Sequence, residues 1–252
     1  MTQPSLIHAI IFDFDDTLID WSRQIKPYPE IYRFHLENLY TFLSETGHTL
    51  PPIETFVQQY QEVVRHAWDE AKIVWAGVNF ATVLKTLFRA LALDLSQIDI
   101  QAAMQAFNWQ PVPNVAPFAD THATLQTLKQ QGYQLGLITN SMMPMWMRDI
   151  ELRAYELIDY FDGRLTSGDF GHMKPHPAIY HELLRQLGCR PEQAIFVGDR
   201  PANDIAGAND AGMISVLMSP PHVIRDLNGV QPDYTIETLQ DLLPILAALE
   251  GA

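Results

Sequence analysis

The sequence has a single cysteine, few basic residues and no long uninterrupted apolar run. Cys189 cannot form a disulfide within the chain, and residues 1–5 lack the charged-then-apolar pattern of a secretory signal. Because 16 basic residues face 30 acidic ones, the formal net charge is -14. This charge argues against a nucleic-acid groove or a cationic membrane-binding face, and no apolar run approaches the roughly 20 residues that span a bilayer. We expect a protein of the reducing cytoplasm that binds no nucleic acid polymer and no membrane.

Short, mostly apolar runs predict strands that are buried on both faces. They lie at Leu6–Phe12, Tyr133–Thr139, Ala194–Gly198, Ile214–Leu217 and Tyr234–Ile236. Between the later runs, Asp120 is expected to cap a helix that stops at Gly132, and Pro177 to start a helix that stops at Gly188. Strands that alternate with helices predict an α/β fold, a doubly wound, Rossmann-like parallel sheet with helices on both faces.

Residues 21–114 show helical periodicity and no convincing strand. Apolar residues recur at three- and four-residue steps after Pro29 and after Pro52, Asn79 is expected to cap a third helix, and a fourth is expected over Gln97–Phe107. The proline-rich return at 111–117 predicts a stiff linker beside the outgoing segment 20–27. We therefore predict an α-helical cap domain, residues 21–114, inserted into a core domain of residues 1–20 and 115–252.

The segment IFDFDDTL, Ile11 to Leu18, places three carboxylates at the end of the first apolar run. Strand alternation predicts that Asp13 and Asp15 point the same way, at the carboxyl edge where open α/β sheets bind ligands. Two carboxylates about 4 Å apart repel by roughly 4 kcal/mol at an effective dielectric constant of about 20. Such a pair requires a cation or a shared proton.

The second predicted strand ends in a group of residues suited to phosphate. Thr139, Asn140 and Ser141 stand at its end, and Pro144 predicts a helix start soon afterwards. Hydroxyl and backbone N–H groups at a helix start form a cradle for phosphate oxygens. We therefore expect Thr139 and Asn140 to bind substrate.

Two later motifs add one positive and two negative charges. Lys174 lies in HMKPHP, where prolines stiffen the loop, and Asp199 and Asp204 lie in VGDRPANDIAGANDAG after the strand at 194–198. The aspartates at 13, 15, 199 and 204 thus set four negative charges against one lysine. Mg²⁺ prefers carboxylates plus waters and shares itself with substrate phosphate, so the pattern predicts a Mg²⁺ site.

In this order, the motifs resemble those of the haloacid dehalogenase superfamily of hydrolases, in the phosphatase branch with a helical cap after the first motif. The matching residues are Asp13, Asp15 and Thr17 in Asp-x-Asp-x-Thr, the strand-end Thr139, Lys174, and Gly198 to Asp204 in Gly-Asp-x-x-x-x-Asp. The resemblance covers nearly the whole chain. One position departs from the family, since Asp16 stands where glycine is common.

The resemblance implies a role for each motif residue. Asp13 is the nucleophile that forms an aspartyl-phosphate, and Asp15 protonates the leaving oxygen and then activates water. Thr139 and Lys174 bind the transferring phosphoryl group. Mg²⁺ is held by Asp13, the backbone carbonyl of Asp15, and Asp199. Asp204 supports the site by orienting Lys174 or a metal-bound water.

The activity that fits these roles is a Mg²⁺-dependent phosphatase for a small phosphorylated metabolite. A 2-haloacid dehalogenase is an alternative, but dehalogenases of this superfamily lack the second acid, so Asp15 favours phosphate. A phosphomutase keeps both acids and stays open. So does a catalytically silent protein that binds a phosphorylated ligand, although such a protein has no reason to keep the costly acid cluster. Monomer and homodimer are equally compatible with the sequence.

Overall fold

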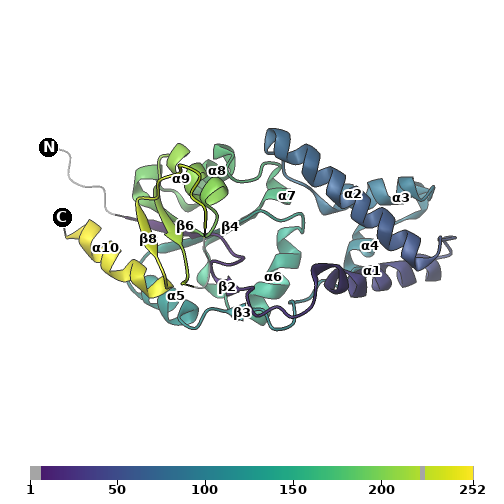
Figure 1. Cartoon of the computed structure of the whole chain (residues 1–252), viewed down its shortest axis with the longest axis horizontal. Coiled ribbons are helices and arrows are strands. Elements are labelled where there is room, and N and C mark those ends of the chain that lie inside the picture. The colour runs from purple at the N-terminus through teal and green to yellow at the C-terminus, as the bar shows by residue number, and fades with distance from the viewer. Residues whose placement is uncertain (1–6, 222–224, 252) are drawn as a thin grey trace.

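The computed structural model describes residues 7–221 and 225–251, and its centre is one six-stranded parallel sheet (Figure 1). The strand order is β5-β4-β1-β6-β7-β8. The strands are β1 (Ala9–Phe12), β4 (Gln134–Thr139), β5 (Gly163–Thr166), β6 (Ala194–Gly198), β7 (Ile214–Met218) and β8 (Tyr234–Ile236). Every neighbouring pair is parallel. The predicted doubly wound α/β fold is confirmed.

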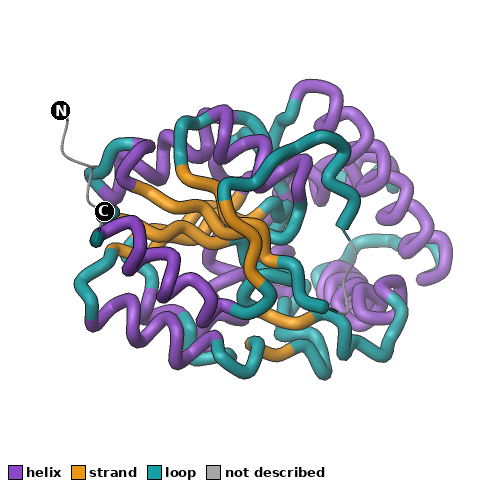
Figure 2. The backbone as a smooth tube through the Cα atoms, turned by 60° about the vertical axis from the view of Figure 1, so that its left-hand side comes forward, coloured by secondary structure: helices purple, strands orange, loops and turns teal. Residues whose placement is uncertain are grey.

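Helices cover both faces of this sheet (Figure 2). On one face lie α5 (Thr121–Gln130), α6 (Met145–Ala154) and α10 (Leu242–Glu250), and on the other lie α8 (Pro177–Leu187) and α9 (Ala206–Asp210). The alternation within β1 explains this layering, because Ile10 and Phe12 pack on the first face and Ala9 and Ile11 on the second.

The stretch between β2 and β3 supplies four helices that gather at one end of the molecule, beyond the sheet (Figure 1). They are α1 (Tyr28–Glu45), α2 (Ile53–Val74), α3 (Phe80–Ala90) and α4 (Ile100–Ala106). As predicted, Asn79 caps α3 by accepting the amide of Thr82 at 3.2 Å. The helices share a hydrophobic cluster of their own. The boundaries 21 and 114 of a cap domain stay a prediction.

Two short strands connect the helical part to the sheet. β2 (Ile19–Asp20) and β3 (Ala116–Pro117) pair antiparallel, with Ile19 opposite Pro117. The outgoing and returning linkers therefore lie side by side, as predicted. Beyond this ribbon, Met142, Met143, Met147 and Met173 of the sheet-bearing part pack against the helical cluster. Unbranched methionine side chains adapt to irregular gaps, which suits a contact between two packed bodies.

Short helical turns complete the described chain. They are α7 (Ser167–Phe170), 3₁₀ turns at Leu95–Gln97, Ile158–Tyr160, Pro191–Gln193 and Leu239–Asp241, and a π turn at Pro201–Ile205. In the described ranges, no helix combines the length and the apolar character that crossing a membrane requires.

Some of the predicted elements need correction. The carboxylate of Asp120 does not cap α5, because it accepts the amide of Gln240 at 2.9 Å instead. The edge strand β5 was not predicted, since Gly163 and Arg164 interrupt its apolar pattern. The fourth insert helix starts at Ile100, where Asp99 accepts two backbone amides, rather than at Gln97. β1 begins at Ala9, and the Leu6 end of its predicted range lies outside the described residues.

Candidate active site

Parallel register brings the predicted site residues to one edge of the sheet. Phe12 is paired with Leu137 on one side and Val197 on the other, so the residues after β1, β4 and β6 meet. The amide of Asp13 donates to the carbonyl of Val197 at 2.8 Å. A small cavity of about 70 Å³ lies here, lined by Asp13, Asp15, Thr139, Asn140, Lys174, Arg200, Asn203 and Asp204.

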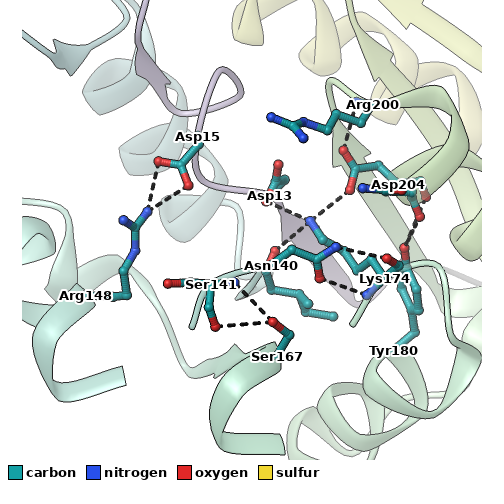
Figure 3. Close-up of polar contacts among 12 residues, drawn as sticks. Asp13, Asp15, Asn140, Ser141, Arg148, Ser167, Lys174, Tyr180, Arg200 and Asp204 are labelled. Atoms are coloured by element: carbon teal, nitrogen blue, oxygen red, sulfur yellow. Dashed lines mark hydrogen bonds and ion pairs between the residues drawn. The ribbon is translucent and has the colours of Figure 1, made fainter. Parts of the chain in front are cut away.

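Lys174 is the buried counterion of this site (Figure 3). Its ammonium lies 2.7 Å from Asp13 Oδ1 and 2.8 Å from Asp204 Oδ1, and it donates to the carbonyl of Ile138 at 2.9 Å. Burial disfavours the charged ammonium, but the two carboxylates outweigh burial and raise the pKa of Lys174 above its ordinary value. Lys174 therefore stays charged and fixes the carboxylate of Asp13.

Asp204 is held close to the end of β6 by its backbone surroundings. Its Oδ2 accepts the amide of Arg200 at 2.9 Å, and the hydroxyl of Tyr180 fixes the same turn by donating to the carbonyl of Asn203 at 2.7 Å. A Cβ atom on Gly198 would lie 2.5 Å from the Asp204 side chain. Glycine at 198 is thus required for the carboxylate of Asp204 to approach Lys174.

Three buried carboxylates form a candidate metal centre. One oxygen each of Asp13, Asp199 and Asp204 lies within 4.8 Å of the others. Burial raises the pKa of Asp13 to about 6, and burial together with Asp13 and Asp204 raises the pKa of Asp199 to about 8. Oδ2 of Asp199 contacts the guanidinium of Arg225, whereas Oδ1 is buried and has no hydrogen-bond partner in the described part of the chain. An unpartnered buried carboxylate oxygen is costly, so a divalent cation fits this group.

The carboxylate of Asp15 faces away from the metal centre, toward α6 (Figure 3). Both of its oxygens accept from the guanidinium of Arg148 at 2.9 Å, and Oδ1 also accepts from Trp21 Nε1 at 2.9 Å. The prediction that Asp13 and Asp15 point the same way is wrong, because β1 ends at Phe12 and strand alternation does not extend beyond it. The backbone carbonyl of Asp15 as a metal ligand stays a prediction.

Arg148 links Asp15 to the returning linker. Its second guanidinium nitrogen lies 2.8 Å from Glu151 Oε2, and the same oxygen accepts from Trp109 Nε1 at 3.0 Å. Glu151 is fully buried, and burial raises its pKa to about 7. A continuous chain of polar contacts therefore runs from Asp15 through Arg148 and Glu151 to Trp109, between the last insert helix and β3.

Residues at the end of β4 line the small cavity and also bind the loop that contains Lys174. Thr139 is buried at the cavity wall, but the side-chain amide of Asn140 pairs with the backbone of Lys174, at 2.8 Å and 2.9 Å. The predicted helix does start after Pro144, yet the amide of Met145 donates to Asp169 at 2.7 Å. The amide of Met145 is therefore already paired with a carboxylate, and a phosphate cradle at this helix start stays a prediction. Contact of Thr139 and Asn140 with substrate stays a prediction.

Asp16 adopts the backbone conformation that explains glycine at this position in the family. Its φ angle is 57°, in the left-handed region that glycine enters most easily and aspartate more easily than most residues. Its carboxylate accepts the amide of Trp21 at 3.2 Å. Asp16 thus closes the loop that leads from Asp15 into β2.

A second, larger cavity of about 490 Å³ adjoins the small one at Asp15 and Asn140. It lies between the insert helices α1 and α2 on one side and the end of β4 with α6 on the other. The two cavities thus meet at Asp15 and Asn140, and one side of the larger cavity is formed by the helical insert.

Arginines are the site residues that sequence reasoning missed. Arg200 follows Asp199 directly, and Arg148 stands three residues before Glu151 on a predicted helix, so both carried a local signal. Arg225 carried none, because it comes from a distant loop. The charge balance was therefore predicted too negative, as Asp15 and Asp199 each have an arginine partner.

Comparisons with known proteins agree with this geometry. A family model for haloacid dehalogenase-like hydrolases matches residues 7–212. The chain is 31% identical to a glyceraldehyde 3-phosphate phosphatase of Methanopyrus kandleri, over 97% of this chain and 99% of that protein. Similar solved structures include a 2-haloacid dehalogenase from Pseudomonas syringae (27% identity, TM-score 0.68, covering 98% of this chain and 100% of that one) and a HAD phosphatase from Thermococcus onnurineus (25%, 0.63, 95% and 98%).

Proposed function

Because the chain belongs to the haloacid dehalogenase-like hydrolases and is a phosphatase of phosphate monoesters, we propose that it cleaves a small phosphorylated metabolite through an aspartyl-phosphate on Asp13. The observation that carries this proposal is the ion pair of 2.7 Å between Asp13 and Lys174, at the edge of a cavity large enough only for a small group. Lys174 fixes the nucleophile and supplies positive charge beside the transferring phosphoryl group.

The reaction has two displacements at phosphorus. A carboxylate oxygen of Asp13 attacks phosphorus, the bond to the leaving oxygen breaks, and Asp15 gives that oxygen a proton. Water then attacks phosphorus, Asp15 takes its proton, and the bond between phosphorus and Asp13 breaks to release inorganic phosphate. Asp15 lines both cavities, and this position at their junction suits proton transfer to the leaving oxygen.

Mg²⁺ is the cation that the carboxylates of Asp13 and Asp199 would hold, and it would offset the negative charge of the phosphoryl group. Asp204 stays with Lys174 in this assignment, because its Oδ1 lies 2.8 Å from the ammonium. The chain's own contribution is to keep the acids buried and close together, so that the site is poised for a cation before substrate arrives.

We expect Asp15→Asn to lower kcat by about 10²- to 10⁴-fold, the range for loss of a general acid–base group. Asparagine keeps the size of the side chain and can still accept from Arg148, so the fold should not change. Single-turnover measurements should show slower formation and slower breakdown of the phosphorylated enzyme. An effect confined to KM would contradict the assigned role.

We expect the apparent affinity for Mg²⁺ to rise with pH, by up to about tenfold per unit, and to level off above about pH 8. Without metal, the pKa of Asp199 is raised to about 8, so Mg²⁺ must displace a proton below that pH.

The same shift in the pKa of Asp199 lowers the stability of the metal-free protein as pH rises from about 4 to about 8, because the folded state keeps a proton that the unfolded state has lost. Titration calorimetry at several pH values measures the affinity for Mg²⁺, and thermal unfolding of the metal-free protein at the same pH values measures the stability.

The control for this titration is Asp199→Asn, which should bind Mg²⁺ weakly and lose the pH dependence. If the affinity for Mg²⁺ does not change between about pH 6 and pH 8, then Mg²⁺ does not displace a proton from Asp199.

A substrate screen separates this function from its alternatives. Phosphorylated sugars, nucleotides, amino acids and short hydroxy acids are assayed for phosphate release with and without Mg²⁺, and 2-haloacids for halide release. We expect phosphate release that depends on Mg²⁺ and no halide. Halide release would establish a dehalogenase, an isomerised phosphate ester would establish a mutase, and tight binding without turnover would establish a silent binding protein.

A further inference from the structure

The wall of the larger cavity includes a group of aromatic rings. Five of its lining residues are Trp21, Tyr32, Tyr60, Trp68 and Trp109. The ring of Tyr32 lies 5.9 Å from that of Trp109 and 6.4 Å from that of Tyr60, so these rings already pack against one another. Rings that are fixed by their neighbours lose little freedom when a ligand stacks on them.

The rest of the wall includes thioether and guanidinium groups, and the guanidinium of Arg148 is paired with Asp15 and Glu151. Met142 and Met143 form an adaptable surface, and Arg65 and Arg148 supply guanidinium groups, while Asp15 is the only carboxylate among the lining residues described. The guanidinium of Arg148 already lies over the Phe14 ring, 4.7 Å from its centroid. Guanidinium and aromatic groups can pack on the face of a planar ring, and a thioether sulfur makes favourable contacts with such a ring, often at its edge.

The size of the cavity excludes a short leaving group as its best occupant. At about 490 Å³ it falls within the roughly 300–1,000 Å³ of pockets that enclose ligands of drug size. A leaving group of two or three carbons would leave most of the aromatic side chains exposed to water. The ring faces also offer few hydrogen bonds to the hydroxyl groups of such a leaving group. A ring would cover the apolar wall and gain from its burial.

We propose that the substrate is a phosphate monoester whose leaving alcohol carries a planar aromatic ring, which stacks in this cavity while the phosphoryl group enters the small one. This inference rests on the proposed phosphatase function and specifies its substrate class.

The test compares esters whose leaving alcohols have similar basicity. The probes are 2-phenylethyl phosphate, 2-cyclohexylethyl phosphate, ethyl phosphate and glycerol 3-phosphate, each assayed with Mg²⁺ for kcat/KM. We expect the phenyl ester to exceed ethyl phosphate and glycerol 3-phosphate by at least about thirtyfold, and the cyclohexyl ester by about threefold or more, since a flat ring fits between flat walls.

Variants of Trp68, whose ring is partly exposed, test whether the preference for the phenyl ester arises in this cavity. Trp68 lies on α2, and Trp68→Ala should lower the preference for phenyl over ethyl ester about tenfold, with recovery in Trp68→Phe. Trp146→Ala is the matched control, because Trp146 is 39% exposed and lines no part of this cavity. It should leave the preference unchanged.

Each outcome decides a separate point. Equal kcat/KM for the phenyl and ethyl esters would overturn the ring proposal and leave the phosphatase function standing. Equal values for the phenyl and cyclohexyl esters would overturn the requirement for a planar ring. If Trp68→Ala and Trp146→Ala lowered the preference for the phenyl ester equally, the aromatic ring of the substrate would not bind in this cavity. No hydrolysis of any ester would overturn the phosphatase function and the ring proposal together.

Discussion

Replacing Asp13 with asparagine is expected to lower turnover by at least about 10⁴-fold while leaving the folded protein as stable as before, or more stable. The loss follows from removal of the nucleophile, since losing a covalent catalyst costs about 10⁴ to 10⁶ in rate. The stability follows from burial, which raises the pKa of Asp13 to about 6. The carboxylate is therefore ionised near pH 7, but its ionisation is less favourable in the folded protein than in the unfolded chain, and asparagine removes this difference. Phosphate release and thermal unfolding without metal measure the two effects.

The matched control is Asp159→Asn, an exposed carboxylate outside both cavities. It should change neither turnover nor the melting temperature appreciably. Turnover of Asp13→Asn within about tenfold of the wild type would assign the nucleophile to another group. A large loss of stability in Asp13→Asn would show that its charge stabilises the fold, contrary to the direction of its pKa.

Replacing Lys174 with methionine is expected to lower the free energy of unfolding by about 3–5 kcal/mol and to abolish measurable turnover. The ammonium has three close partners and is fully buried, so its removal leaves the carboxylates of Asp13 and Asp204 without their cation. The loss should be larger near neutral pH than at acidic pH, because the pKa of Asp13 is raised to about 6 and its carboxylate is ionised above that pH. Denaturant unfolding at two pH values, with phosphate release, checks these expectations.

Two variants show whether the loss arises from the buried pair. Lys129→Met breaks the exposed pair of Lys129 with Asp162, 2.7 Å apart, and should cost at most about 1 kcal/mol. The double variant Lys174→Met with Asp204→Asn should recover part of the stability but none of the turnover. If Lys174→Met cost no more than Lys129→Met, the buried cation would not be what holds the acids together.

Much of this site could be predicted from the sequence because parallel strands end at a common edge. Asp13, Thr139 and Asp199 each follow or end an apolar run, and the observed register of β1 with β4 and β6 brings those ends together. The position of Lys174 followed from its motif rather than from a strand. The helical insert was predictable from its periodicity, since four amphipathic helices share one hydrophobic cluster.

Side-chain directions outside regular elements could not be predicted. The loop after Phe12 turns Asp15 toward Arg148, and nothing local indicates a partner 133 residues away. The charge of Arg225 reaches Asp199 from a loop with no motif. Asp120 looked like a cap but pairs with Gln240, which shows how a distant backbone amide can override a local preference. Such contacts depend on tertiary packing, which the sequence pattern does not specify.

The most direct test is a crystal structure of the protein with Mg²⁺ and beryllium fluoride, a mimic of the phosphoryl group. We predict beryllium bonded to a carboxylate oxygen of Asp13, with Mg²⁺ coordinated by Asp13 and Asp199 and the ammonium of Lys174 beside the fluorides. A structure in which the ion binds elsewhere, or in which Asp13 carries no beryllium although Mg²⁺ and fluoride are saturating, would contradict the account.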